Sequence, residues 1–376
     1  MRSFRYSSLL GLIALSLVAC KSPSNEIPVG AYLSLSGPDS TFGSDTRDGI
    51  ELAVEQTNAT GLKGKKVRLF YEDDKSTPME ASNKVRQLID RNKVVAVLGE
   101  VASSRSMAGG LVANTSKVPM VTPSSTAIDV TKNREFVFRT CFTDAQQGEV
   151  AARYVYENMK KTKVGILFAA QDTYSSGLAQ SFRENFLKLG GAIVVEKGFQ
   201  KGETNFTTYL EELKAKDPEM IYAPVYYNEM VQIARQAKHV GLAGSMFMGG
   251  DGWDSSNLIE GAGAELEGAR FTNGYAPDVP WPKSKGFITA FQAKYHRAPN
   301  SLSAQGYDAA MVLFDAIQRS ENGSPDSVRK ALGETKDFAG ATGNITIDKN
   351  RNAKKAIVVV AIHDNAFKFD SVITTQ

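Results

Sequence analysis

The most constraining feature of this sequence is a repeated alternation of short β-branched runs with segments of helical period. Apolar residues between the runs recur three and four positions apart, as at Ile50, Ala53 and Val54, which is typical of amphipathic helices. The runs themselves are short and predict eight strands: Val29–Leu35, Val67–Tyr71, Val94–Leu98, Pro119–Thr122, Val164–Phe168, Ile193–Val195, Met220–Ala223 and Met246–Met248. Strand and helix alternating this often predict parallel sheets with helices on both faces.

The predicted strand-helix units fall into two groups, separated by the segment from Phe136 to Gln147. A chain of 376 residues is long enough for two domains with their own cores. We therefore expect an α/β protein of two doubly wound parallel-sheet lobes. Beyond Gly274 we expect helices near 287–295 and 304–317, and then an antiparallel pair, 356–362 with 367–373. This pair must join the edge of an existing sheet, so the chain should cross between the lobes more than once.

The N-terminus predicts export. Residues 1–19 combine two arginines with an apolar run from Leu9 to Val18, which is too short to span a bilayer. The ending Leu17-Val18-Ala19-Cys20 resembles the bacterial lipobox, in which the chain is cut before a cysteine that then carries lipid. We therefore expect a lipoprotein signal peptide over 1–19, lipidation of Cys20 and a polar tether over 20–26. An ordinary signal peptide that happens to end in Cys is the alternative. The expected location is the bacterial cell envelope, facing the periplasm or the outside.

Composition excludes several classes of function. The 44 basic and 41 acidic residues are spread along the chain and give a formal charge of +3, so nothing points to a nucleic acid. His239, His296 and His363 lie far apart and only two cysteines are present, so neither a metal site nor a cofactor is expected. With Cys20 acylated, Cys141 has no partner and is expected to be a small buried residue.

Hydroxyl-rich turns follow two strands of the first group. Ser103 and Ser104 come after 94–98 where a helix should begin, and Ser124 and Thr126 come after 119–122. Because parallel strands end at one edge of a sheet, these hydroxyls could together hold a carboxylate. The alternatives are a plain helix N-cap for the first turn and an ordinary loop for the second.

In the second group, each turn after a strand supplies an aromatic residue or an acid. Tyr174 follows 164–168, Tyr226 follows 220–223, and Asp251 and Trp253 follow 246–248. Asp251 among glycines could offer a negative charge to an ammonium group, and Trp253 could cover an apolar side chain. The alternative for Asp251 is a turn residue that bonds its own backbone.

In combination these motifs resemble the leucine/isoleucine/valine-type periplasmic binding proteins. The resemblance covers nearly all of the mature chain. It is carried by Leu35-Ser36-Gly37-Pro38 with Phe42-Gly43, Tyr71-Glu72-Asp73-Asp74, Gly99 to Ser104, Thr122 to Thr126, Gln171 to Tyr174, Tyr226 to Met230 and Met248 to Gly252. The family consists of two-lobed, hinge-closing receptors that deliver amino acids or related small molecules to an ABC transporter permease.

The resemblance implies a role for each site residue. Ser103 and Thr126 would hold the ligand carboxylate. The backbone near Ser124, together with Thr126, would meet the amine, which Asp251 would neutralise. Tyr174 and Tyr226 would close from the second lobe, and Phe42 would lie near the ligand side chain. Branched-chain members of the family commonly carry Glu where this sequence has Asp251, and often a disulfide near Asp73 that is absent here.

The resemblance also implies a three-segment hinge near 142–147, 271–276 and 347–352. Lobe one would comprise 26–143 with 275–349, and lobe two 144–274 with 350–376. The mature chain is expected to be a monomer.

Two other classes of function compete with a receptor. A hydrolase is disfavoured because there is no G-x-S-x-G motif and no histidine beside a strand-end turn that offers Ser or Cys. Paired acids such as Asp73 and Asp74 would point to opposite faces of a strand, so they should not act jointly as acid and base. A lipid-anchored sensor or structural envelope protein that uses the same fold without transport is the second alternative.

Overall fold

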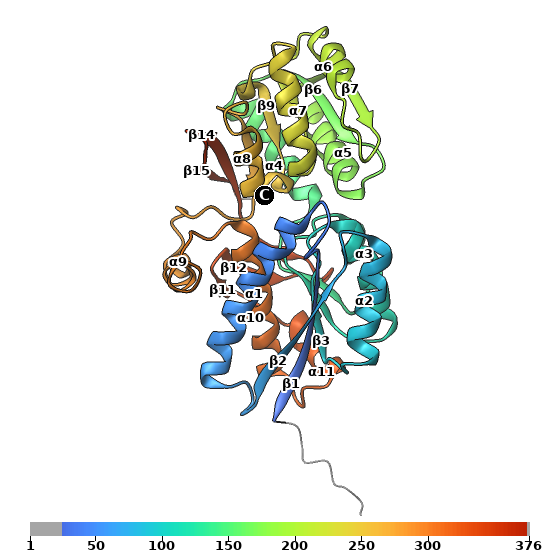
Figure 1. Ribbon diagram of the computed structural model, residues 1–376, viewed down its shortest axis with the longest axis vertical. Coiled ribbons are helices and arrows are strands. Elements are labelled where there is room, and N and C mark those ends of the chain that lie inside the picture. The colour runs from blue at the N-terminus through green and yellow to red at the C-terminus, as the bar shows by residue number, and fades with distance from the viewer. Residues whose placement is uncertain (1–24, 374–376) are drawn as a thin grey trace, which may run out of the picture.

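The computed structural model describes residues 25–373 (Figure 1). The expected signal peptide over 1–19, the lipidation site Cys20 and most of the tether lie outside the described residues, so they stay predictions.

The first sheet holds five parallel strands in the order β2-β1-β3-β4-β5. Strand β1 alternates strictly between the faces of this sheet, because Val29, Ala31 and Leu33 pack on one side and Tyr32 on the other. The strands are β1 (Glu26–Leu33), β2 (Lys66–Asp73), β3 (Ala96–Leu98), β4 (Met120–Thr122) and β5 (Val137–Arg139).

Helices cover both faces of the first sheet (Figure 1). Helices α1 (Ser40–Thr60) and α10 (Ser301–Arg319) pack on the face that carries Val29, and α2 (Pro78–Asp90) and α3 (Ser103–Thr115) on the face that carries Tyr32. Helix α11 (Pro325–Gly333) packs against α10. Local sequence sets the start of α2, where Thr77 accepts a hydrogen bond from the backbone of Glu80 and proline occupies the first turn.

The second sheet has seven strands in the order β15-β14-β10-β9-β8-β6-β7. The expected antiparallel pair at the C-terminus is confirmed: it joins the edge of this sheet through β10. The strands are β6 (Lys163–Ala169), β7 (Ala192–Phe199), β8 (Met220–Tyr222), β9 (Phe247–Gly249), β10 (Arg270–Asn273), β14 (Ile357–His363) and β15 (Ala366–Ile373).

Two helices of the second lobe begin at capping residues that the sequence shows. Thr143 and Gln146 form a capping box at the start of α4, and Asp172 caps α5. The helices are α4 (Asp144–Arg153), its π-helical extension η2 (Tyr154–Asn158), α5 (Thr173–Lys188), α6 (Thr207–Lys214), α7 (Tyr227–His239) and α8 (Ser256–Ala262). Short 3-10 turns precede and follow β9, at η3 (Gly244–Met246) and η4 (Asp251–Trp253).

A three-stranded antiparallel sheet and one helix complete the first lobe. They are β11 (Phe338–Gly340), β12 (Gly343–Ile347), β13 (Ala353–Lys354) and α9 (Pro282–Tyr295); the 3-10 turn η1 (Ile128–Val130) follows β4. Because β13 pairs with β12 and Ala353 packs in the core beside β1, the third passage between the lobes falls after Lys354 rather than at 349–350. The division into lobes at the other two boundaries stays a prediction.

Two smaller observations concern the whole molecule. Cys141 is fully buried, as expected, and burial raises its pKa to about 12; within residues 25–373 its thiol is free. Among residues 25–373, no helix combines the length and the apolar composition that crossing a membrane requires.

Candidate functional site

The first lobe contributes two turns at the carboxyl ends of β3 and β4. Gly99 opens the first turn at φ +124°, where an added Cβ would lie 2.2 Å from the carbonyl oxygen of Tyr32, so only glycine fits. Ser103 then begins α3, yet the N-cap is Ala102 and no side chain caps this helix. The Ser103 hydroxyl instead accepts a hydrogen bond from the Ala127 backbone at 3.1 Å. The plain N-cap alternative is therefore wrong, and Ser103 ties the two turns together.

The second turn carries hydroxyls that the protein itself leaves unused. Ser124 and Thr126 are both buried, and neither hydroxyl has a hydrogen-bond partner of normal geometry. Ser125 lies between them and points the other way, with its Oγ 2.7 Å from the carbonyl of Val101. Buried polar groups are nearly always hydrogen-bonded, so two free hydroxyls at one turn mark a place where a ligand or water is expected to bind.

The second lobe contributes two stacked tyrosines and one acid. The rings of Tyr174 and Tyr226 are parallel, with centroids 5.0 Å apart. The Tyr174 hydroxyl accepts a hydrogen bond from the Gly252 backbone at 2.9 Å. An added Cβ on Gly252 would lie 2.9 Å from the Tyr226 ring, so glycine here lets the Asp251 turn approach both tyrosines. Phe42, from the first lobe, meets Tyr226 edge-on at 5.7 Å.

These residues line one small cavity between the lobes. Of the eight residues predicted to contact a ligand, seven line it. The lining consists of Phe42, Val101, Ser103, Ser124, Thr126, Tyr174, Tyr226, Asp251, Gly252 and Leu302. The hydroxyls come from the first lobe and the acid and tyrosines from the second, so the cavity offers partners to both ends of a small zwitterion.

Trp253 is the exception, and the expectation that it covers a ligand is wrong. Its side chain is fully buried, its indole Nε1 donates to the carbonyl of Ala223 at 3.1 Å, and its ring packs near Phe271. The 3-10 turn η4 directs Asp251 and Trp253 in different directions, so Trp253 supports the Asp251 turn from the core.

No Lys or Arg among residues 25–373 forms an ion pair with Asp251. Its carboxylate accepts a hydrogen bond from Gln147 Nε2 at 2.9 Å. Burial raises its pKa to about 6, although hydrogen bonds from Gln147 and Tyr174 work in the opposite direction. A ligand ammonium would supply the positive charge that this acid lacks.

Sequence reasoning missed several residues around the cavity. Gln147 orients Asp251. Asp144 is buried below the site, and burial raises its pKa to about 8; Thr126 is near enough to lower that pKa, although its hydroxyl makes no hydrogen bond of normal geometry. Asp144 and Gln147 belong to the segment that the sequence predicts as a boundary between the lobes. The capping motif at Thr143 is the signal that a helix begins there.

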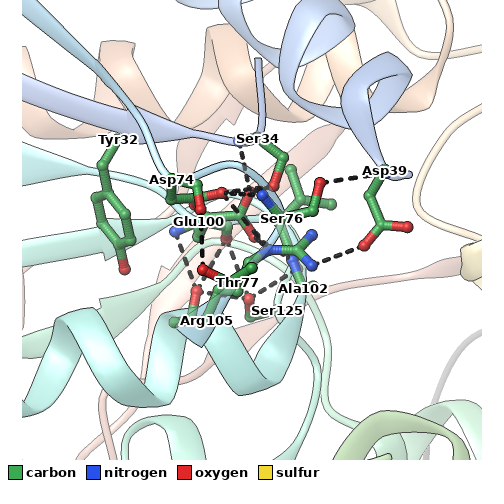
Figure 2. Close-up of polar contacts among 12 residues, drawn as sticks. Tyr32, Ser34, Asp39, Asp74, Ser76, Thr77, Glu100, Ala102, Arg105 and Ser125 are labelled. Atoms are coloured by element: carbon green, nitrogen blue, oxygen red, sulfur yellow. Dashed lines mark hydrogen bonds and ion pairs between the residues drawn. The ribbon is translucent and has the colours of Figure 1, made fainter. Parts of the chain in front are cut away.

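A buried ionic cluster behind the first turn was also missed (Figure 2). Arg105, 1% exposed, donates to Glu100 at 2.8 Å and to Asp39 at 2.6 Å, with Asp74 at 4.0 Å. Burial, followed by repulsion from Glu100, raises the pKa of Asp74 to about 7. Asp73 precedes Asp74 in the chain but accepts hydrogen bonds from Leu35 and Ser36. The adjacent acids therefore occupy separate environments, as expected.

Contacts between the lobes flank the cavity. Tyr227 donates to the Pro38 carbonyl at 2.7 Å, the hydroxyls of Thr41 and Ser255 lie 3.0 Å apart, and Asp254 accepts from the Ser301 backbone at 3.0 Å. The two lobes are therefore in direct contact beside the site.

A larger cavity of about 600 Å³ lies between the start of α9 and the three-stranded sheet. Its lining includes Trp281, Lys283, Lys354 and Lys355 and contains no carboxylate or hydroxyl side chain. It cannot pair with both ends of a zwitterion, so the smaller cavity between the lobes is the better candidate despite its size.

Two α/β lobes that meet around a small cavity have the architecture of a solute-binding receptor. A family model described as periplasmic binding protein matches residues 26–366, and the chain belongs to this family. A Leu/Ile/Val-binding protein homolog from Brucella melitensis is 33% identical over 327 residues, which is 85% of this chain and 87% of that protein. The family consists of binding proteins rather than enzymes and functions outside the cytoplasm.

Solved structures agree with this assignment. The crystal structure of a leucine-binding protein from Thermotoga maritima superimposes with a TM-score of 0.88 at 36% identity, covering 93% of this chain and 99% of that one. A branched-chain amino acid transporter substrate-binding protein from Streptococcus pneumoniae, solved in complex with isoleucine, gives 0.87 at 30% identity with the same coverage. The predicted two-lobed periplasmic binding protein fold is confirmed.

Proposed function

We propose that this protein captures an amino acid, most simply an aliphatic one, by closure of its two lobes. The observation that carries the proposal is the polarity of the cavity: the hydroxyl residues Ser124 and Thr126 of one lobe line the same cavity as Asp251 of the other. In this proposal Ser103 and Thr126 bind the carboxylate, the backbone near Ser124 together with Thr126 meets the amine, and Asp251 neutralises it.

The remaining walls suit an apolar side chain. Phe42, Val101 and Leu302 line the cavity, and Tyr174 and Tyr226 close over it from the second lobe. Contact with such surfaces stabilises a buried aliphatic group by about 25 cal/mol per Å² removed from water. Relatives described as binding leucine or isoleucine support this choice.

We also propose that the receptor is a lipid-anchored monomer that delivers its ligand to an ABC transporter permease. Strand β1, which begins at Glu26, starts at the end of the first lobe far from the second lobe (Figure 1). Five residues separate Glu26 from Cys20, and the six Cα–Cα steps between them can span at most about 21 Å. A lipid on Cys20 would therefore hold that end of the protein near a membrane and leave the cleft away from the surface.

Calorimetry on residues 21–376 with the twenty amino acids, simple amides and urea tests the proposal. We expect an aliphatic amino acid to bind with a Kd near micromolar, which corresponds to roughly −8 kcal/mol. If no compound gives heat at millimolar concentration, the amino-acid receptor is wrong, and a sensor or structural protein of the same fold becomes the better explanation.

A further inference from the structure

Asp39 occupies the N-cap of α1 but does not cap the helix. An aspartate at this position usually accepts a hydrogen bond from a backbone N–H of the first helical turn. Here α1 has no side-chain cap, and the Asp39 carboxylate, 4% exposed, accepts from Arg105 Nη1 at 2.6 Å instead. The start of α1 is thus fixed by a buried ion pair to α3 and not by its own cap.

The other edge of the same guanidinium fixes the turn that leads to Ser103. Arg105 Nε donates to Glu100 Oε2 at 2.8 Å, and that oxygen also accepts from the Ala102 backbone at 2.7 Å. The second oxygen of Glu100 accepts from the Ser34 backbone at 3.0 Å. Figure 2 shows Arg105 between Glu100 and Asp39, so one side chain bridges two segments of the first lobe.

The start of α1 is also where the first lobe touches the second. The Pro38 carbonyl accepts from the Tyr227 hydroxyl at 2.7 Å, and the Phe42 ring meets the Tyr227 ring at 5.0 Å. Phe42 lines the cavity as well. Arg105 therefore connects two parts of the first lobe. One is the turn that precedes Ser103, whose hydroxyl is proposed to bind the ligand. The other is the start of α1, which contacts the second lobe.

Stability alone does not explain this arrangement. A buried ion pair loses the hydration of both charges, and apolar residues of similar size often stabilise a core as well or better. Tyr226 of the second lobe lies near both Arg105 and Asp39. Closure of the second lobe would exclude water from the Arg105–Asp39 pair, and the attraction between the two charges strengthens when water leaves.

We propose that Arg105 is a positioning residue that couples lobe closure to the geometry of the Ser103 turn through Asp39 and Glu100. This inference rests on the proposed function, because closure on a ligand is what the coupling serves. Removing the Asp39 charge should therefore loosen the Ser103 turn and weaken ligand binding, although Asp39 does not line the cavity.

The test is a double-mutant cycle on L-leucine binding with Asp39→Asn and Tyr227→Phe. Asp39→Asn should weaken binding about tenfold or more and Tyr227→Phe several-fold. In the Asp39→Asn background, Tyr227→Phe should add less than twofold, because the start of α1 is already released. Asp48→Asn is the matched control: it lies on α1 and pairs with Arg297 at 2.7 Å, and it should leave the Kd unchanged.

Amide hydrogen exchange provides a readout that does not need a ligand. Asp39→Asn should speed exchange over 99–104 as well as over 37–43, whereas Asp48→Asn should not affect 99–104. If Asp39→Asn cannot be purified, Arg105→Lys takes its place, since lysine keeps the positive charge but loses the paired contact with Glu100 and Asp39. Unchanged exchange over 99–104, or binding effects that multiply independently, would overturn the coupling. Failure of the wild type to bind any amino acid would instead count against the proposed function, and exchange would still decide the coupling.

Discussion

Asp251→Asn tests the proposed ligand polarity most sharply. Asparagine keeps the size of the side chain and an acceptor oxygen for Gln147, which donates to Asp251 at 2.9 Å. What it loses is the negative charge opposite the ligand ammonium. A hydrogen bond to a charged group contributes about 1.5 to 3 kcal/mol, so the Kd should rise roughly 10- to 150-fold.

The pKa of Asp251 gives this prediction a pH dependence. Burial raises the pKa from 3.8 to about 6 in the protein without ligand, and an ammonium should bind the ionised form. Wild-type affinity should therefore fall by about tenfold between pH 7.5 and pH 5, as the carboxylate becomes protonated. The Asp251→Asn variant should show no such fall.

The pH dependence of stability is opposite to the pH dependence of ligand binding. An acid whose pKa is raised by folding contributes stability that is complete below pH 3.8 and lost as pH rises through about 6. Asparagine does not lose this contribution, so the ligand-free variant should be no less stable than the wild type at pH 7.5. Calorimetry from pH 5 to 7.5, with thermal unfolding of the same samples, measures both quantities. If Asp251→Asn binds the wild-type ligand with unchanged Kd, the ligand carries no ammonium at this position and the assignment of an amino acid is refuted.

Three further predictions concern the other parts of the site and the anchor. Ser103→Ala and Thr126→Ala should each weaken binding by about 1 kcal/mol or more in calorimetry, whereas the neighbouring Ser104→Ala, which does not line the cavity, should have no effect. Tyr174→Phe should leave the Gly252 N–H without its partner and lower the free energy of unfolding by about 1 to 3 kcal/mol in a denaturant titration; an unchanged midpoint would show that this N–H finds another acceptor. Cys20→Ser should move the protein from the membrane to the soluble fraction without changing ligand affinity, and mass spectrometry showing a mature N-terminus at any residue other than Cys20 would exclude the anchor.

Periodicity was sufficient to predict the architecture but not every strand. The expected strands correspond to β1 to β4 and β6 to β9, with ends shifted by a few residues. Strands β5 and β10 were missed, and their length is not the reason, since β3, β4, β8 and β9 have only three residues each. No segment of helical period was recognised beside them in the sequence. The three-stranded sheet was missed for the same reason.

The site could be predicted where it depends on chain order. Turns after parallel strands gather at one edge of a sheet, which is why Ser103, Thr126, Tyr174 and Asp251 line one cavity. Trp253 was misplaced because proximity in sequence to Asp251 says nothing about direction within a 3-10 turn. Arg105 could not be assigned at all, since Asp39 lies 66 positions away and only the folded chain brings the two together.

A crystal structure of residues 21–376 with the amino acid that binds most tightly in calorimetry tests the central claim most directly. The account predicts that the ligand occupies the cavity between the lobes, with its carboxylate within hydrogen-bond distance of Ser103 and Thr126 and its ammonium beside Asp251. A ligand bound in the reverse orientation, or outside this cavity, would contradict it.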